Sequence, residues 1–146
     1  MNILSFKTSL GWITLSEDKN LIYSVKFGKK KNKGRKLVLF KAKKQILEFI
    51  EGKRKKFSVK LNIQGTSLQK QIWHQLSIIK YGSTITYGNI AKKLHTSPRY
   101  VGNVCGQNKH LIVVPCHRVV KNNGQLGGFS SIGGTKLKQQ LLDLEK

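Results

Sequence analysis

The sequence contains few acidic residues, and their distribution excludes several kinds of chemistry. Only 6 of the 146 residues are Asp or Glu, and no carboxylate side chain occurs from Gly52 through Leu142. Sites that hold two metal ions need clustered Asp and Glu ligands, and glycoside hydrolysis needs a pair of carboxylates. The sequence therefore argues against a metal-dependent nuclease or polymerase and against a glycosidase.

Cysteines and long apolar runs are also scarce. The two cysteines, Cys105 and Cys116, make no disulfide framework, so we expect a reduced, cytoplasmic protein. No segment approaches the roughly 18 consecutive apolar residues that cross a bilayer. The first residues lack the charged and apolar regions of a signal peptide. We therefore expect no membrane segment and no targeting segment.

Basic residues, by contrast, are abundant. The chain has 28 Lys and Arg residues and a formal net charge of +22. Self-repulsion among these charges opposes the compact state, so the excess is not explained by folding. It is typical of proteins that bind nucleic acid. An anionic membrane is the rival partner, and the absence of a spanning segment does not favour it.

Residues 1–63 predict a small N-terminal α+β domain. Alternating apolar and polar residues, with turn signals at 9–11 and 17–20, indicate three antiparallel strands. Apolar residues at helical spacing predict a helix that ends at Gly52, and the alternating residues 57–63 predict one more strand. The basic segment 29–36, "KKKNKGRK", is either a mobile linker or an auxiliary phosphate contact.

Residues 64–146 predict a mainly helical C-terminal domain. Thr66 and Gln69 have capping-box spacing at the start of one helix. Residues 87–94 predict a second helix, and Ser97 followed by Pro98 predicts the start of a third. Two short helices joined by a tight turn in a basic chain resemble a helix-turn-helix. The remaining sequence indicates β-structure over 110–120, a glycine-rich loop over 122–134 and a terminal helix.

The segment "VVPCHRVV", residues 113–120, contains the candidate nucleophile. A thiol becomes a good nucleophile when a neighbour shares its proton. His117 follows Cys116 directly, but adjacent residues of a strand point to opposite faces. Contact between them therefore needs a turn at Pro115 or a bridging water. From these residues alone Cys116 is either a nucleophile or a buried free thiol, and Asp143 and Glu145 are the acids that could orient His117.

A zinc site is a further alternative for the same region. Its ligands would be Cys105, His110, Cys116 and His117, but their spacing matches no common zinc pattern. Cys105 lies at helical spacing with Val101 and Val104, so we expect it in the core. The sequence therefore predicts no metal site.

Three motifs together resemble the O6-alkylguanine-DNA alkyltransferase family, also called methylated-DNA–protein-cysteine methyltransferases. They are "PRYVGNVCGQN", "PCHRVV" and "GQLGGFS". The resemblance covers residues 66–146 closely and the first 60 or so in general shape. It implies an α+β protein with a ribonuclease-H-like domain over 1–63 and a helical, winged-helix-like domain over 64–146. It also implies irreversible, single-turnover transfer of an alkyl group from O6-alkylguanine, with O4-alkylthymine as a second candidate substrate, and no cofactor.

The resemblance assigns roles to individual residues around the thiol. Cys116 would accept the alkyl group, His117 would deprotonate it through a water, and Glu145 would hold His117. Counted straight from the cysteine, Asp143 lies at the family's usual distance. The loop before the last helix is about two residues longer than in the shortest family versions, which moves the match to Glu145 and makes Asp143 the second choice. Asn108 would brace the turn before the cysteine, and its alternative role is an ordinary helix C-cap.

The family also implies that the damaged nucleotide leaves the duplex, since a stacked O6-alkyl group is out of reach. Arg99 would fill the vacated stack from the minor groove, and Tyr87 would turn the phosphate. Without the resemblance, Arg99 is an ordinary phosphate contact and Tyr87 packs two helices together. Ser97, Tyr100 and Arg118 are further candidate DNA contacts.

The resemblance also names a substrate pocket, and it leaves two rival classes open. The pocket residues are Val114, Pro115, Phe129, Ser130 and Ser131, and Tyr is the more usual residue at the position of Phe129. The expected partner is double-stranded DNA containing O6-alkylguanine, bound by a monomer. The rivals are a non-enzymatic lesion-binding module, whose relatives carry Trp in place of the cysteine, and a cysteine hydrolase.

Overall fold

The computed structural model describes residues 1–129 and 131–146, which form two compact units. The first unit comprises Met1–Ile63 and Lys109–Val113, and the second comprises Gln64–Asn108 and Val114–Lys146. The boundary predicted from the sequence, at residue 64, places residues 109–113 in the C-terminal domain instead. They join the first unit because Val25 donates a backbone hydrogen bond to Lys109 and accepts one from Leu111.

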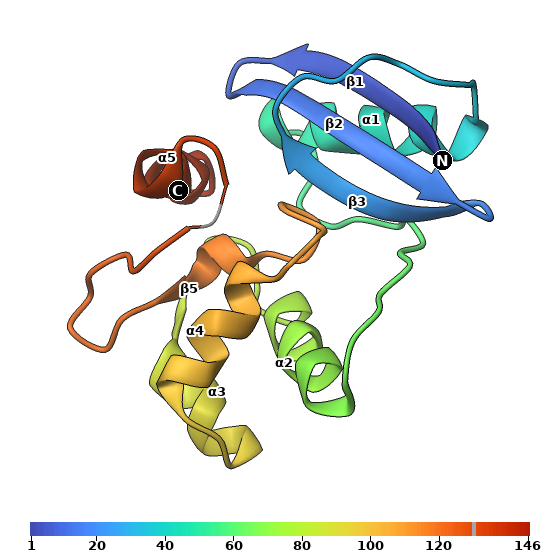
Figure 1. Ribbon diagram of the computed structural model, residues 1–146. Coiled ribbons are helices and arrows are strands. Elements are labelled where there is room, and N and C mark those ends of the chain that lie inside the picture. Colours follow the sequence, from blue (N-terminus) through green and yellow to red (C-terminus); the bar gives the residue numbers. More distant parts are fainter. Residues whose placement is uncertain (130) are drawn as a thin grey trace. The chain divides into compact units, whose positions relative to one another are not determined.

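The first unit is an antiparallel sheet with one helix packed on it (Figure 1). Strands β1 (Asn2–Thr8), β2 (Gly11–Asp18) and β3 (Leu21–Phe27) lie in the order β1-β2-β3, which confirms the three predicted strands. Lys19 and Asn20 both have positive φ, as a two-residue hairpin turn of type I′ requires. Helix α1 (Leu37–Ile50) contacts all three strands and buries an apolar face against them.

Two segments of the first unit differ from the sequence-based predictions. Residues 57–63 are not a strand: the Gln45 side chain of α1 donates to the Ser58 hydroxyl and accepts from the Ser58 backbone N–H, and only Leu61 bridges to Ile22 of β3. The basic segment is not a free linker. Lys33 forms an isolated antiparallel bridge with Ile3 of β1, which ties this segment to the edge of the sheet.

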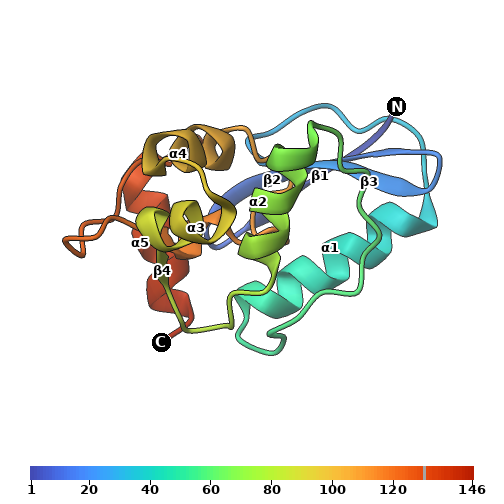
Figure 2. The same ribbon diagram turned by 90° about the horizontal axis from the view of Figure 1, so that it is seen from below.

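The second unit is mainly helical (Figure 2). It contains α2 (Ser67–Ser77), α3 (Tyr87–Leu94), α4 (Pro98–Gly106) and α5 (Gly134–Leu144), with the short parallel strands β4 (Ile85–Thr86) and β5 (Val119–Val120).

The helix caps in the second unit follow the sequence closely. The capping box of Thr66 and Gln69 is present, and the Ser97 hydroxyl accepts a hydrogen bond from the backbone N–H of Tyr100. His95, with φ of 56°, ends α3. These features confirm the predicted starts of α2 and α4. Across the described part of both units, no helix combines the length and apolar character needed to span a bilayer.

The predicted β-structure over 110–120 is mostly wrong. Only β5 is a strand, and Cys116–Arg118 form a single 3-10 turn, η1. Pro115 has φ of −82° and ψ of 66°, and the backbone N–H of Cys116 donates to the carbonyl of Val114 at 2.8 Å. This is an inverse γ-turn, and the proline ring favours its φ. The alternation of strand side chains therefore does not apply to Cys116 and His117.

Candidate active site around Cys116

Cys116 opens onto a cavity of about 780 Å³ that lies within the second unit. Cys116 itself is buried, with only 5% of the residue exposed. The cavity is lined by residues from α3, α4, η1 and the loop after β5: Tyr87, Gly88, Pro98, Arg99, Gly102, Cys105, Gly106, Cys116, Lys121, Asn122, Asn123, Gly127, Gly128 and Phe129. Small-molecule sites typically enclose about 300–1,000 Å³. The thiol therefore faces a space large enough for a nucleobase.

The turn that presents the thiol is braced by Asn108. Its side-chain amide donates to the carbonyl of Val114 at 2.8 Å, and this is the carbonyl that also closes the turn. Gln107, and not Asn108, is the C-cap of α4. Of the two roles predicted for Asn108, bracing the turn is therefore the one that the structure shows. Burial raises the pKa of the Cys116 thiol, while a hydrogen bond from the Asn108 side chain lowers it. The net increase keeps the resting thiol protonated, so its reaction needs a base.

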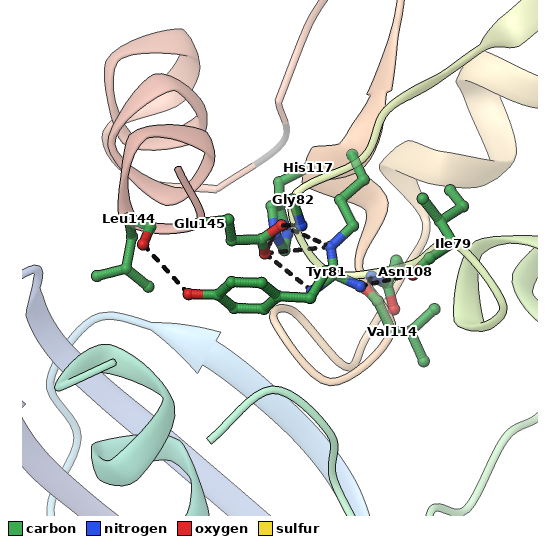
Figure 3. Close-up of polar contacts among 9 residues, drawn as sticks. Ile79, Tyr81, Gly82, Asn108, Val114, His117, Leu144 and Glu145 are labelled. Carbon is green, nitrogen blue, oxygen red and sulfur yellow. Dashed lines mark hydrogen bonds and ion pairs between the residues drawn. The ribbon is translucent and has the colours of Figure 1, made fainter. Parts of the chain in front are cut away.

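The carboxylate of Glu145 lies at the centre of a buried polar cluster (Figure 3). His117 Nε2 lies 2.7 Å from Glu145 Oε2, and Arg118 Nε and Nη2 donate to the two carboxylate oxygens at 2.9 Å. The backbone N–H of Gly82 donates to Oε1 at 3.0 Å. Burial by itself raises the pKa of Glu145, but the hydrogen bonds from His117, Arg118 and Gly82 lower it to about 2. Glu145 is therefore ionised at neutral pH.

This cluster prepares His117 to accept a proton. Burial lowers the pKa of His117 from 6.5, against the opposing effect of Glu145. The imidazole is therefore neutral near pH 7, and an Nε2–H that donates to Glu145 leaves Nδ1 as an acceptor. His117 Nδ1 is buried and has no hydrogen-bond partner in the part of the chain that is described. Asp143, the second choice for this role, is exposed and bonds to Gln139 instead.

Lys138 of α5 is a functional candidate that our sequence analysis did not identify. Its residue is fully buried, and its ammonium donates to the hydroxyl of Tyr87 at 3.2 Å and to the carbonyls of Leu126 and Gly128 at 2.5 and 3.2 Å. It thereby ties the glycine-rich loop to the start of α3. Its place three residues before the buried Leu141, on one face of the helix, was the available signal.

Replacing Lys138 with methionine is expected to loosen this loop. The variant keeps the aliphatic length but leaves two carbonyls without a donor, at a cost of about 1–3 kcal/mol each, partly offset by removal of a buried charge. We expect faster amide hydrogen exchange over residues 124–129 and a lower free energy of unfolding. Lys136→Met, on the exposed side of the same helix, is the control. Equal exchange in the two variants would show that Lys138 does not hold the loop.

A glycine allows the loop to approach Tyr87 closely. Gly127 has φ of 76°, and a Cβ there would lie 2.9 Å from the Tyr87 hydroxyl. Tyr87 is itself half-buried, and burial raises its phenol pKa to about 12. Its ring also lies within 3.9 Å of where a Cβ of Gly102 in α4 would be. Tyr87 therefore both packs against α4 and lines the cavity.

The predicted DNA contacts fall into two groups. Arg99 is exposed and lines the cavity, Ser97 is an exposed cap, and Tyr100 is half-buried. Arg118 is different: its residue is 5% exposed, and its guanidinium is bonded to Glu145 and to the carbonyl of Ile79. The assignment of Arg118 to DNA contact is therefore corrected, because its donors already serve the buried cluster.

The predicted pocket residues are also only partly brought together. Phe129 lines the cavity, whereas Val114, Pro115 and Ser131 are not among the described lining residues, and Ser130 lies outside the described residues. Val114 contributes its carbonyl to the brace instead. Cys105 is buried as expected, but it also lines the cavity, so the core assignment is incomplete.

The zinc alternative concerns Cys105, His110, Cys116 and His117. Among the described residues, no group of three or more His, Cys, Asp and Glu side chains is arranged to hold a metal ion.

Comparisons with known proteins give a consistent result. Residues 67–146 match the family described as 6-O-methylguanine DNA methyltransferase, DNA binding domain. The inducible methylated-DNA–protein-cysteine methyltransferase of Bacillus subtilis is 44% identical over 104 residues, which is 70% of this chain and 57% of that protein. The methylated-DNA–protein-cysteine methyltransferase of Methanosarcina acetivorans is 37% identical over 96% of this chain and 95% of its own length.

Solved structures extend the similarity over the whole chain. A crystal structure of the Mycobacterium tuberculosis O6-methylguanine methyltransferase matches with a TM-score of 0.88 and 29% identity, over 99% of this chain and 92% of that one. A structure of Mycobacterium tuberculosis OGT in complex with DNA matches with a TM-score of 0.89 and 30% identity, over 100% and 93% of the two chains. The mixed α/β fold is therefore that of these relatives.

Proposed function

The chain belongs to the methylated-DNA–protein-cysteine methyltransferase family, and on that basis we propose that it repairs O6-alkylguanine in DNA by direct transfer of the alkyl group to Cys116. The observation that carries the proposal is the cluster in which Glu145 holds His117 beside a buried thiol that faces a nucleobase-sized cavity. O4-alkylthymine is a second candidate substrate. The ribonuclease-H-like and winged-helix-like descriptions of the domains over 1–63 and 64–146 belong to the same proposal.

The chemical step needs only residues of the chain and the damaged base. The thiol proton passes through a water to His117 Nδ1, whose imidazole becomes positively charged beside the Glu145 carboxylate. The Cys116 sulfur forms a bond to the alkyl carbon, and the bond from that carbon to O6 breaks with its electron pair staying on guanine, which is left as an anion and takes up a proton from water. The product is a thioether, which is stable and leaves no free thiol at position 116. Each molecule therefore reacts once.

The partner we propose is double-stranded DNA containing the damaged guanine, bound by a cytoplasmic monomer. The basic charge and the helix pair α3–α4 support DNA binding. A flipped base would enter the cavity beside Phe129, with Arg99 at the rim. The lesion-binding module without chemistry is less favoured, because Cys116 and its polar cluster have no part in binding alone.

Arg99→Ala is expected to separate extrusion of the base from alkyl transfer. Transfer from O6-methylguanine in a duplex should slow by about tenfold or more, which is at least about 1.4 kcal/mol of activation free energy. Transfer from free O6-benzylguanine should not change, because no stack has to be filled. Single-turnover rates on the two substrates measure the effect.

The control for this experiment is Lys70→Ala, which removes an exposed cation of α2 that does not line the cavity. It should leave both rates close to wild type. If Arg99→Ala slows both substrates equally, the side chain supports the cavity and does not replace the flipped base. If wild type transfers from neither substrate, the proposed function itself is wrong.

A further inference from the structure

The N-terminal unit carries more positive charge than the unit that contains the cavity. The first unit has 18 Lys and Arg, Lys109 included, against 4 Asp and Glu, a net charge of +14, whereas the second unit has 10 against 2, a net charge of +8. All residues that line the cavity and all members of the Glu145 cluster belong to the second unit. The chemistry at Cys116 therefore does not account for the charge of the first unit.

Part of this charge lies on a segment whose backbone is fixed. We call residues 29–36 the basic edge. Lys33 and Ile3 of β1 exchange two backbone hydrogen bonds, at 2.8 and 2.9 Å. Two further hydrogen bonds join the segment to Ser5. The backbone N–H of Ser5 donates to the Asn32 side chain at 2.8 Å, and the hydroxyl of Ser5 accepts from the backbone N–H of Lys30 at 3.3 Å. The lysines of the basic edge are thus displayed along β1 from an ordered backbone.

Lys36 is close enough to Glu17 to help lower the pKa of that carboxyl, but the four exposed lysines of the basic edge are not neutralised by the protein. Lys29, Lys30, Lys31 and Lys33 are exposed, and none of them forms an ion pair in the described part of the chain. The carboxylates of Glu48 and Glu51 in the same unit pair with Arg54 and Lys53.

The remaining polar contacts of the edge do not change its charge. The Lys29 ammonium lies 4.6 Å from the centroid of the Trp12 ring, and the Arg35 guanidinium lies 6.0 Å from that of Phe40. Cation–π contacts orient a cation and leave its charge in place. A row of uncompensated positive charges therefore faces solvent.

We propose that the basic edge, residues 29–36, is a second DNA-binding surface that contacts phosphates independently of sequence. This proposal rests on the proposed function, which identifies the polyanion as DNA. The exposed lysines and the fixed backbone of the edge indicate where the phosphates bind. A membrane is a poorer partner, because the segment contains no apolar side chain that could insert into lipid. The edge gives the protein affinity for undamaged DNA, through which it searches for lesions.

The test compares two quadruple variants of the full chain that lose the same charge. One is Lys29→Gln, Lys30→Gln, Lys31→Gln and Lys33→Gln in the basic edge. The other is Lys19→Gln, Lys26→Gln, Lys56→Gln and Lys60→Gln, which are exposed positions of the same unit outside the edge. The measurements are the affinity for an unmodified duplex and the affinity for phosphatidylserine vesicles, each as a function of salt concentration. Benzyl transfer from free O6-benzylguanine monitors the cavity in both variants.

The edge variant should bind the duplex at least tenfold more weakly at low salt. The slope of log K against log salt should become shallower by about 2–4, since each lost phosphate contact contributes about 0.9. The control variant should keep most of the slope, and both should react fully with O6-benzylguanine.

Three results would overturn the proposal. They are an unchanged slope in the edge variant, equal losses in the two variants, and a loss confined to binding of phosphatidylserine vesicles. Equal losses would mean that net charge alone is responsible. Failure of wild type to react with O6-benzylguanine would instead contradict the proposed function, and it would leave the salt comparison intact.

Discussion

Cys116→Ala is expected to abolish alkyl transfer to the protein while DNA binding is retained. The thiol at position 116 is the atom that forms the new bond, and alanine offers no replacement. Its loss costs the fold only about 1 kcal/mol, and the exposed Arg99 and the α3–α4 pair that we assign to DNA are unaltered. Transfer is measured with labelled methyl groups in a duplex, and binding with the same duplex by fluorescence anisotropy.

The second cysteine makes this a demanding test. Cys105 lines the same cavity, and burial raises its thiol pKa to about 12. Cys105 lies in α4 and is followed by Gly106, whereas Cys116 is followed by His117, which Glu145 orients, so we expect no transfer to Cys105. Cys105→Ala is the matched control and should react once per molecule. Label on Cys105 in the Cys116→Ala protein would show that the cavity, and not the cluster, selects the nucleophile.

Glu145→Gln is expected to weaken both the fold and the reaction. Arg118 would lose the carboxylate that neutralises it in the interior, and breaking a buried pair typically costs about 3–5 kcal/mol. His117 would lose the anion that stabilises its protonated form, so transfer from free O6-benzylguanine should slow by roughly 10²-fold or more. The rate is measured per folded molecule, at a temperature where circular dichroism shows the variant to be native.

Asp143→Asn is the matched control for this substitution. Asp143 is exposed on the same helix, where it pairs with Lys146, and solvent and salt screen exposed pairs so that they contribute little to stability. Its replacement should change neither the unfolding free energy nor the rate appreciably. Equal effects at the two positions would contradict the assignment of Glu145 as the residue that holds His117.

The pH dependence of stability gives an independent check on Glu145. Its pKa falls from 4.5 to about 2 on folding, a shift of about 3 kcal/mol in linked stability. A carboxyl whose pKa is lowered by folding stabilises the protein fully above the unfolded value. That contribution is lost as the pH falls from about 4.5 toward 2. Wild type should therefore lose more stability than Glu145→Gln over this interval.

Local chemistry explains which parts of the fold were predictable. The hairpin turn at Lys19 and Asn20, the Thr66 capping box and the Ser97 cap each depend on a few neighbouring residues. The alternation over residues 57–63 was misleading, because the partner that decided its structure was Gln45, on a helix earlier in the chain. Propensity describes the segment, whereas long-range hydrogen bonds decide whether it joins a sheet.

The reacting residues of the active site were predictable from the sequence, whereas the buried residues that hold them in place were less so. The family resemblance led to Cys116, His117 and Glu145, whereas spacing alone pointed to Asp143, and the terminal helix brings Glu145 to the η1 turn. Spacing did not reveal that Arg118 is buried against the same carboxylate. Nor did it reveal Lys138, since a lysine in a basic chain is expected at the surface. Arg118 and Lys138 are both buried cations whose partners lie far away in the sequence. Only the packed structure shows which groups neutralise or solvate them.

The most direct test of the central claim is the intact mass of the wild-type protein after incubation with excess O6-benzylguanine. The account predicts a shift equal to one benzyl group per chain, located on Cys116 by peptide mapping, with one guanine released for each molecule modified. An unshifted mass would contradict alkyl transfer, and guanine released in excess of the protein would contradict a reaction that each molecule performs once.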